Sequence, residues 1–155
     1  MPELPEVETV RRGLEDRLKH FYVQDIEVLS ERTISSIGGT SVFNENIKGS
    51  ILGNWTRRGK YLICYLQSQN SDAHAGWLVV HLRMTGQFTW LNSTQIPCSH
   101  TRVRFWNSFG NEIRFVDTRN FGQMWWVSPE HKPREEINGL MKLGPEPFSS
   151  DFNPL

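Results

Sequence analysis

The sequence has little of three things that would narrow its function at once: cysteine, net charge and long apolar runs. Its two cysteines, Cys64 and Cys98, are too few for a disulfide framework or a zinc site, which takes about four ligands. We interpret both as reduced thiols of a cytoplasmic protein. No apolar run is long enough to cross a membrane and no signal peptide opens the chain, so we expect neither membrane insertion nor export.

The charge balance argues against a uniformly basic protein. The 17 Lys and Arg residues equal the 17 Asp and Glu residues, so the formal net charge is zero. Domains that bind nucleic acid usually carry a basic footprint. A nucleic-acid function would therefore require either basic residues gathered on one face or a further part of the protein outside this sequence. The length of 155 residues and 37% hydrophobic content predict one globular domain with a core.

The hydrophobic pattern changes from helical to strand-like early in the chain. Val7, Val10, Leu14 and Leu18 recur at helical spacing, which predicts a helix over residues 5–20. A loop at 35–40 and one helical turn at 43–48 follow the first expected strand. Breakers separate the expected strands, which are 22–29, 51–57, 60–66, 76–82, 87–91, 101–106, 112–116 and 123–127. One helix followed by many strands predicts a mainly β fold with flanking helices, a two-sheet β-sandwich over residues 1–140.

The first six residues, MPELPE, are unusual for a chain start. Removal of Met1 would leave Pro2 with a free secondary amine, and an α-amino group has an ordinary pKa of about 7.7–8.0. Such an amine attacks a sugar C1′ or a carbonyl to give an iminium, with Glu3 fixed beside it as proton donor or acceptor. The alternative is a simple helix start, since proline and acidic residues both suit the first turn. From these residues alone the helix start is favoured.

Further candidates lie at turns and strand ends. Lys60 follows Gly59, which allows close backbone approach to a ligand, although a solvated cation on a hairpin is the alternative. Met84 stands between an apolar strand and a glycine, where it is either core filler or an exposed wedge for a base stack. Arg119 and Phe121 are two apart and share a side if the chain is extended. The alternatives are an ion pair of Arg119 with Asp117 and a core position for Phe121.

Five motifs occur together in one order: PELPEVETVRRGLE, RRGKYL, HLRMTG, DTRNFG and LGPEPF. In this the chain resembles the N-terminal domain of bacterial formamidopyrimidine-DNA glycosylases, repair enzymes for oxidised purines. The related endonuclease VIII branch usually has Gly where this chain has Leu4. The resemblance implies a two-sheet sandwich, and it implies that residues 141–155 begin a connection to a helix–two-turn–helix and zinc-finger half outside this sequence. We therefore expect no cofactor or metal in this chain.

The resemblance also implies the chemistry, a DNA glycosylase with AP lyase activity acting on 8-oxoguanine and formamidopyrimidines. Pro2 would attack C1′ and form a Schiff base with the sugar. Glu3 and Lys60 would move protons, and Glu6, three residues from Glu3, would position it. The alternative is a truncated, catalytically weak or inactive fragment that only binds the lesion.

The expected partner is double-stranded DNA containing oxidised purines, with no protein partner and no membrane. The resemblance implies that Met84, Arg119 and Phe121 fill the space left by the flipped nucleotide, with Arg119 pairing with the orphaned cytosine. His100 would contact a phosphate. Arg102, where family members often carry a second histidine, remains a plausible phosphate ligand. We interpret His81 as structural.

Overall fold

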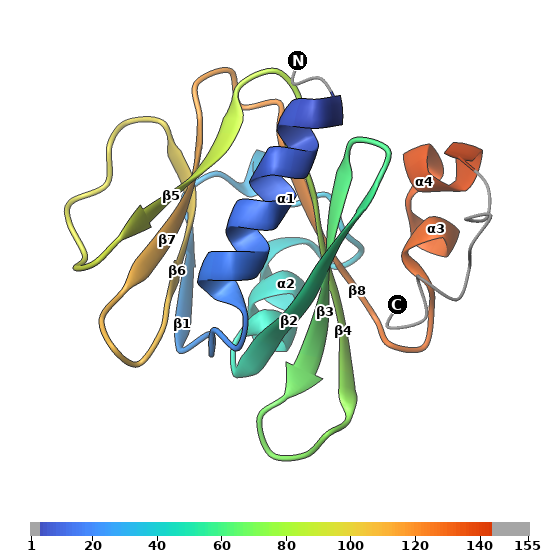
Figure 1. Cartoon of the computed structure of the whole chain (residues 1–155), viewed down its shortest axis with the longest axis horizontal. Coiled ribbons are helices and arrows are strands. Elements are labelled where there is room, and N and C mark those ends of the chain that lie inside the picture. The colour runs from blue at the N-terminus through green and yellow to red at the C-terminus, as the bar shows by residue number, and fades with distance from the viewer. Residues whose placement is uncertain (1–3, 144–155) are drawn as a thin grey trace.

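A computed structural model describes residues 4–143 of the chain, which fold into a sandwich of two four-stranded antiparallel sheets (Figure 1). The strand order is β1-β6-β7-β5 in one sheet and β2-β3-β4-β8 in the other. The strands are β1 Asp25–Val28, β2 Ser50–Arg58, β3 Tyr61–Ser68, β4 His74–His81, β5 Gly86–Leu91, β6 Thr101–Trp106, β7 Glu112–Asp117 and β8 Gln123–Val127. The predicted fold class is confirmed, and the strand bounds agree closely except for β1, which is shorter than expected.

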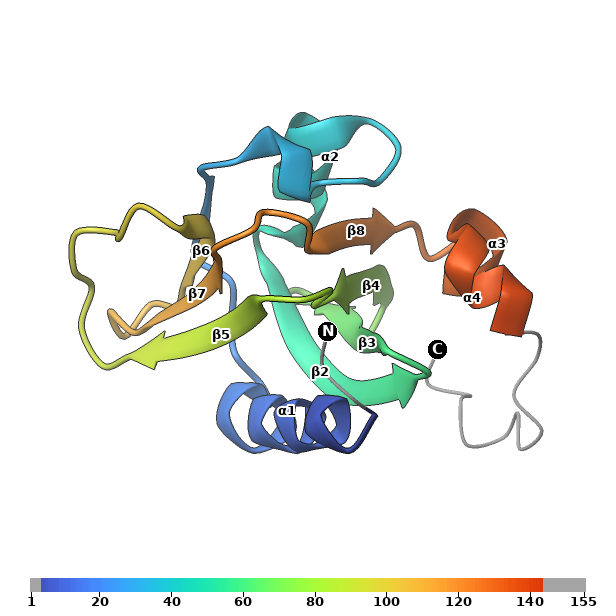
Figure 2. The same cartoon turned by 90° about the horizontal axis from the view of Figure 1, so that it is seen from above.

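Two helices lie at opposite sides of the sandwich (Figure 2). Helix α1, Leu4–Leu18, packs against β2, and its buried residues Val7, Leu14 and Leu18 follow the predicted helical spacing. Helix α2, Gly39–Ile47, contacts β8 and β1 and buries Phe43 and Ile47. We expected only one helical turn here; the helix instead starts directly after Gly38.

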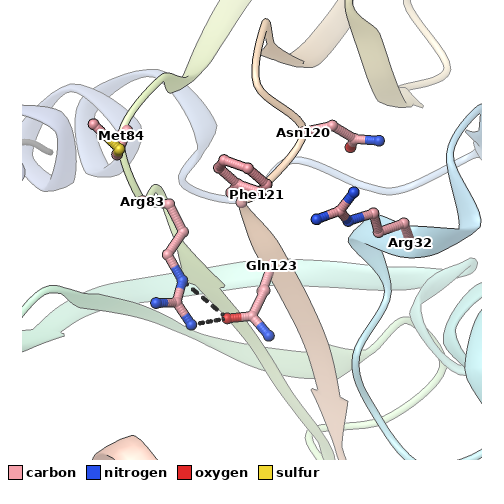
Figure 3. A pocket seen from close by; sticks show the side chains of 7 residues that line it. Arg32, Arg83, Met84, Asn120, Phe121 and Gln123 are labelled. Carbon is pink, nitrogen blue, oxygen red and sulfur yellow. Dashed lines mark hydrogen bonds between the residues drawn. The ribbon is translucent and has the colours of Figure 1, made fainter.

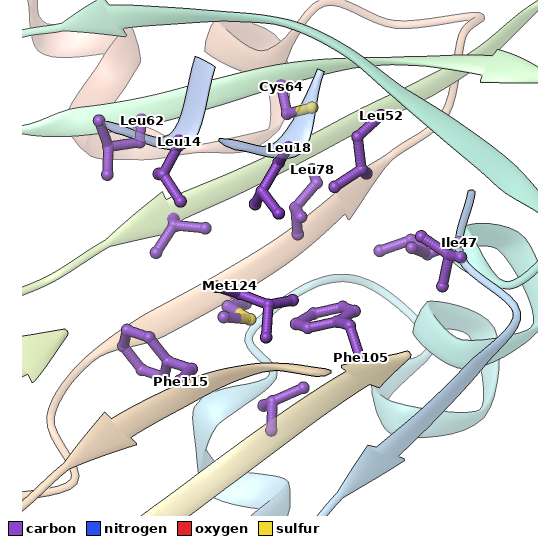
Figure 4. Close-up of a cluster of buried hydrophobic side chains, with 14 of the residues drawn as sticks. Leu14, Leu18, Ile47, Leu52, Leu62, Cys64, Leu78, Phe105, Phe115 and Met124 are labelled. Carbon is purple, nitrogen blue, oxygen red and sulfur yellow. The ribbon is translucent and has the colours of Figure 1, made fainter. Parts of the chain in front are cut away.

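The core lies between the sheets (Figure 4). Strand β6 shows how the sequence specifies it, because Thr101, Val103 and Phe105 are buried while the residues between them are partly exposed. This period of two is the pattern of a strand with one face on the core. The residues labelled in the core come from both sheets and both helices, including Leu18, Ile47, Phe115 and Met124.

A second, smaller apolar cluster covers the other face of the β2-β3-β4-β8 sheet. Two short helices, α3 Pro133–Glu136 and α4 Asn138–Leu143, bring Ile137 and Leu140 onto this face, where they pack with Trp77 and Trp125. Strand β4 is buried from Trp77 to His81 because both of its faces are covered. Leu140 is buried on this face, whereas residues 144–155 lie outside the described part.

Candidate functional site

A turn between β4 and β5 presents Met84. Arg83 has a positive φ of 55°, and the Gly86 amide donates to the carbonyl of Leu82 over 2.9 Å. The Arg83 amide donates to Nδ1 of the buried His81 over 3.0 Å, which fixes the strand end below the turn. Met84 lies at the tip and is 48% exposed, so it is a surface residue and not core filler.

A second turn, between β7 and β8, carries Arg119 and Phe121. Its anchor is the buried Asp117, whose Oδ2 accepts from the Gly122 amide over 2.7 Å and whose Oδ1 accepts from the Thr85 hydroxyl. The Arg119 amide donates to the same hydroxyl over 3.1 Å, so Thr85 joins the two turns. The two carboxylate oxygens of Asp117 accept from Thr85 and Gly122. Among residues 4–143 no ion pair joins Asp117 to Arg119, so that alternative is wrong.

Met84, Arg119 and Phe121 converge into one exposed group, called here the wedge cluster. Nη1 of Arg119 donates to the sulfur of Met84 over 3.6 Å, and its Cζ lies 5.9 Å from the centre of the Phe121 ring. Phe121 is 44% exposed, so the alternative of a core position is wrong. The backbone between Arg119 and Phe121 is not extended, because Asn120 has a φ of 58°, and the residues meet through a turn.

The wedge cluster has a third support that no sequence motif indicated. The one-turn helix η1, Glu31–Thr33, lies beside the β7–β8 turn. Nδ2 of Asn120 donates to the Ser30 hydroxyl over 3.0 Å, and the Thr33 hydroxyl donates to Oδ1 of Asn120 over 3.3 Å. The Arg32 guanidinium lies 5.0 Å from the centre of the Phe121 ring. These contacts join residues that are far apart in the sequence, so no local sequence pattern predicts them.

An open pocket of about 500 Å³ lies between η1 and the two turns (Figure 3). Arg83 donates to Oε1 of Gln123 through Nε, over 3.1 Å, and through Nη2, while Nε2 of Gln123 donates to the Ser35 hydroxyl. The residues lining the pocket combine cations, amides and apolar groups; they are Arg32, Arg83, Met84, Asn120, Phe121, Gly122 and Gln123. A pocket of this composition suits a ligand that has both charged and flat apolar parts.

Gly122, which ends DTRNFG, is required by close packing. A Cβ there would lie 2.6 Å from Cζ of Phe115 and 2.8 Å from Oδ2 of Asp117. Both distances are shorter than any van der Waals contact allows. The glycine therefore lets the turn approach the core phenylalanine while its amide reaches Asp117.

His100 and Arg102 lie beside the same turn. His100 is exposed, and its carbonyl accepts from the Asp117 amide over 2.9 Å. Nε of Arg102 donates to the Asp117 carbonyl over 2.9 Å, so this side chain is partly used in holding the strand end. The structure thus brings both candidates to the base of the wedge cluster, although Arg102 is half-buried.

Lys60, the first residue of the expected strand 60–66, instead occupies the two-residue turn between β2 and β3, one position before β3 starts. Gly59 has a φ of 58°, a conformation that glycine adopts readily and that tight hairpins favour. The pKa of His81 is lowered to about 4, mainly by burial and to a smaller extent by the charges of Arg83 and Lys60. Tyr61, which follows Lys60, pairs with His81 at the end of β4, so Lys60 is close to the strand end that carries the Met84 turn. His81 is buried and accepts from the Arg83 amide.

The start of α1 is tied to this hairpin by an ion cluster that sequence reasoning missed. Glu8 pairs with Arg57 over 3.2 Å, and Nη1 of Arg57 donates to the Gly59 carbonyl over 3.1 Å. Hydrogen bonds from Arg11 and Arg57 outweigh partial burial and lower the pKa of Glu8 to about 2. Arg11 also donates to the Trp55 carbonyl over 3.1 Å.

The N-terminal candidates lie at or beyond the start of α1. Glu6 is exposed in the first turn of the helix. Pro2 and Glu3 lie outside the described residues, whose first member, Leu4, opens α1. Glu8 therefore holds the beginning of α1 against the β2–β3 hairpin that carries Lys60.

The described residues contain no long apolar helix and no obvious metal centre. Across residues 4–143, no helix has the length and apolarity to cross a membrane, and no three His, Cys, Asp or Glu residues are grouped to hold a metal ion. Cys64 is buried and Cys98 is exposed, and both are free thiols.

Comparison with known families gives one match that covers most of the chain. The sequence model of the formamidopyrimidine-DNA glycosylase N-terminal domain matches residues 1–124. The chain belongs to the formamidopyrimidine-DNA glycosylase family. A relative of that name from Prochlorococcus marinus strain SARG is 65% identical over all of this chain and 55% of its own length. One from Parasynechococcus marenigrum is 54% identical over 99% of this chain and 53% of its own length. The chain thus spans about half the length of the curated relatives it matches.

Solved structures agree with this family. Lactococcus lactis Fpg in complex with DNA containing an abasic site has a TM-score of 0.73 and 28% identity, over 83% of this chain and 45% of that chain. The same protein with DNA containing FAPY-dG has a TM-score of 0.72 and 29% identity, again over 83% of this chain and 45% of that chain. The sandwich described above is therefore the fold of this family's N-terminal domain.

Proposed function

We propose that the chain is the catalytic half of a DNA glycosylase with AP lyase activity that removes oxidised purines from duplex DNA. The observation that carries this proposal is the wedge cluster, in which Met84, Arg119 and Phe121 meet at the surface from two separate turns. Exposed apolar and planar side chains of this kind enter a base stack and offset the cost of unstacking, roughly a few kcal/mol per step. The solved relatives bound to lesion-containing DNA support the same assignment.

The chemistry begins at the amine of Pro2 once Met1 has been removed. The nitrogen attacks C1′ of the flipped nucleotide, and the C1′–N bond to the base breaks. The base leaves with the bonding electrons and takes up a proton. Loss of the amine proton and opening of the C1′–O4′ bond, with a proton delivered to O4′, gives an iminium. Glu3 is the acid and base closest to these atoms along the chain, and Glu6 positions it.

Strand cleavage follows from the iminium. Removal of a C2′ proton turns the iminium into an enamine. The enamine electrons then break the C3′–O bond, the phosphate leaves with that electron pair, and a conjugated iminium remains. Lys60 serves as an acid and base in this step and as a contact for the phosphate. Its place on a tight two-residue turn, beside the strand end that leads to Met84, supports this role. His100 and, more weakly, Arg102 hold the backbone, and Arg119 pairs with the orphaned cytosine.

Borohydride trapping tests the proposal. Borohydride delivers hydride to the iminium and leaves a stable amine, so the mature chain should form a covalent complex with a lesion duplex. The matched control inserts Ala between Met1 and Pro2, which makes the proline nitrogen an amide and should abolish trapping. Intact mass verifies both termini before the assay.

The outcomes separate the alternatives. Trapping by the variant with a verified residue before Pro2 would overturn the Pro2 assignment. A mature chain that shifts the lesion duplex but leaves no trapped species would instead support the non-catalytic binder.

A further inference from the structure

Arg32 belongs to none of the five motifs, yet it lies against the wedge cluster. It is exposed on η1, and its Cζ is 5.0 Å from the centre of the Phe121 ring. Figure 3 shows Arg32 and Met84 on opposite sides of that ring. A guanidinium over an aromatic ring interacts through the ring face, while its N–H donors point outward in its own plane.

The two other arginines near the ring have other contacts or another proposed partner. Arg83 donates twice to Gln123. Arg119 donates to the sulfur of Met84 and is assigned above to the orphaned cytosine. Between residues 4 and 143, no hydrogen bond or ion pair joins the guanidinium of Arg32 to another side chain or to the backbone. Of the two cations that line the pocket, Arg32 is therefore the one whose guanidinium donors are all left unused by residues 4–143.

The backbone that carries Arg32 is firmly held. Ser30 and Thr33 bond to the Asn120 side chain, and the amide of Ser30 donates to the Arg102 carbonyl over 3.2 Å. The adjacent Leu29 amide donates to the same carbonyl over 2.8 Å. Arg32 is thus placed between the Phe121 turn and the strand that follows His100, and its donors are presented by a fixed element.

We propose that Arg32 binds a backbone phosphate of the DNA duplex beside the base step that Phe121 enters. This inference rests on the proposed function, because it takes the wedge cluster to be inside a duplex. A base step is flanked by phosphodiesters, and the planar guanidinium fork matches two phosphate oxygens. A guanidinium that binds this phosphate can stay over the Phe121 ring, so one side chain contacts both the ring and the phosphate.

Binding measured across a salt series tests the inference. Each phosphate contact contributes about −0.9 to the slope of log affinity against log salt on B-DNA. Arg32→Gln should remove this increment, so that between about 50 and 200 mM salt the wild-type chain loses about 3.5-fold more affinity than the variant. Arg32→Lys should keep the wild-type slope because it keeps the charge.

Arg17→Gln is the matched control. Arg17 is also an exposed guanidinium over an aromatic ring, 5.2 Å from the centre of Trp90, but it lies in the last turn of α1. The Arg17→Gln substitution removes the same charge as Arg32→Gln and should leave the slope unchanged. An equal fall in slope for Arg17→Gln would overturn the inference, since the effect would then be one of net charge.

Lesion and undamaged duplexes are measured in parallel, so that the two proposals fail separately. An unchanged slope for Arg32→Gln in a chain that prefers the lesion duplex would overturn the Arg32 contact alone. A reduced slope in a chain that neither prefers the lesion nor forms a trapped complex would keep the contact and overturn the repair activity. Absence of DNA binding by the wild-type chain would overturn both.

Discussion

On the outer face of β6 and β7 two guanidiniums surround a buried carboxylate, whereas at the β7–β8 turn two guanidiniums lie against an exposed phenyl ring. In the first cluster Glu112 is fully buried, and Arg104 and Arg114 both donate to its Oε2. Burial raises the pKa of Glu112, but these two hydrogen bonds and one from Thr94 outweigh it and lower the pKa to about 2. In the second, Arg32 and Arg119 flank Phe121 at 5.0 and 5.9 Å.

The difference separates arginines that hold the fold from arginines that remain available to a ligand. Arg104 and Arg114 also donate to the Gln95 carbonyl, so the buried cluster fixes the loop that leads to His100. Their charge is neutralised inside the molecule. The arginines around Phe121 keep their charge at the surface, so a chain with no net charge still has cations there for the proposed contact with DNA.

The largest expected effect is on the buried cluster. Glu112→Gln should lower the free energy of unfolding by roughly 3–5 kcal/mol, because it leaves two partly buried guanidiniums without their counter-charge. Glu27→Gln is the control, since Glu27 also pairs with Arg104 but is 46% exposed and should cost less than about 1 kcal/mol. Denaturant unfolding measures both. Equal costs would show that burial does not distinguish the two carboxylates.

A smaller loss of stability is expected where the wedge cluster meets the core. Gly122→Ala places a methyl group against Phe115 and Asp117, and overpacking of this kind costs about 1–3 kcal/mol. Gly13→Ala is the control, because an added Cβ there meets nothing within 4 Å and α1 should gain about 0.5–1 kcal/mol. A Gly122→Ala chain as stable as wild type would mean that the β7–β8 turn is not packed as described.

Acid should weaken the support under Met84. The pKa of His81 is about 4 in the fold against an ordinary 6.5, so below pH 6.5 the unfolded chain binds more protons and stability falls until pH reaches about 4. The stability that depends on a neutral His81 is fully present above pH 6.5. His81→Asn, whose side-chain oxygen can still accept from the Arg83 amide, should lack this dependence of stability on pH. Unfolding free energies of both chains across this range test it, and superimposable pH profiles would contradict it.

Most of the fold was predictable from local patterns. The alternation in β6 and the spacing of Val7, Leu14 and Leu18 each reflect one element against one core, so the sequence specifies them directly. The lengths of α2, α3 and α4 were not predictable, because short helices bury few residues and give weak periodicity. What covers the outer face of a sheet depends on the whole topology.

The residues of the candidate site could be predicted from the sequence, but the backbone geometry that brings them together could not. Met84, Arg119 and Phe121 could be selected from their motifs, although their meeting depends on the left-handed backbone of Asn120 and not on an extended strand. Arg32 was missed because it meets Phe121 across a long sequence separation. Glu8 was missed for the same reason, since its partner Arg57 lies on a distant hairpin.

The smallest effect on stability is expected at the wedge cluster itself. Met84→Ala and Phe121→Ala remove exposed side chains and should change the free energy of unfolding by no more than about 0.5 kcal/mol. Phe109→Ala is the control, because Phe109 is 87% exposed on a different turn. Thermal unfolding of the three variants checks that any loss of DNA binding is not a loss of fold.

The most direct test of the account compares two DNA substrates for these variants. The affinity of each chain is measured for an intact duplex containing an oxidised purine and for a duplex with a pre-formed abasic gap. If the wedge cluster offsets unstacking, Met84→Ala and Phe121→Ala weaken binding to the intact duplex several-fold more than binding to the gap, where most of that cost is already removed, and Phe109→Ala changes neither. Equal losses on the two substrates would contradict the account and would make the cluster a packing feature of the two turns.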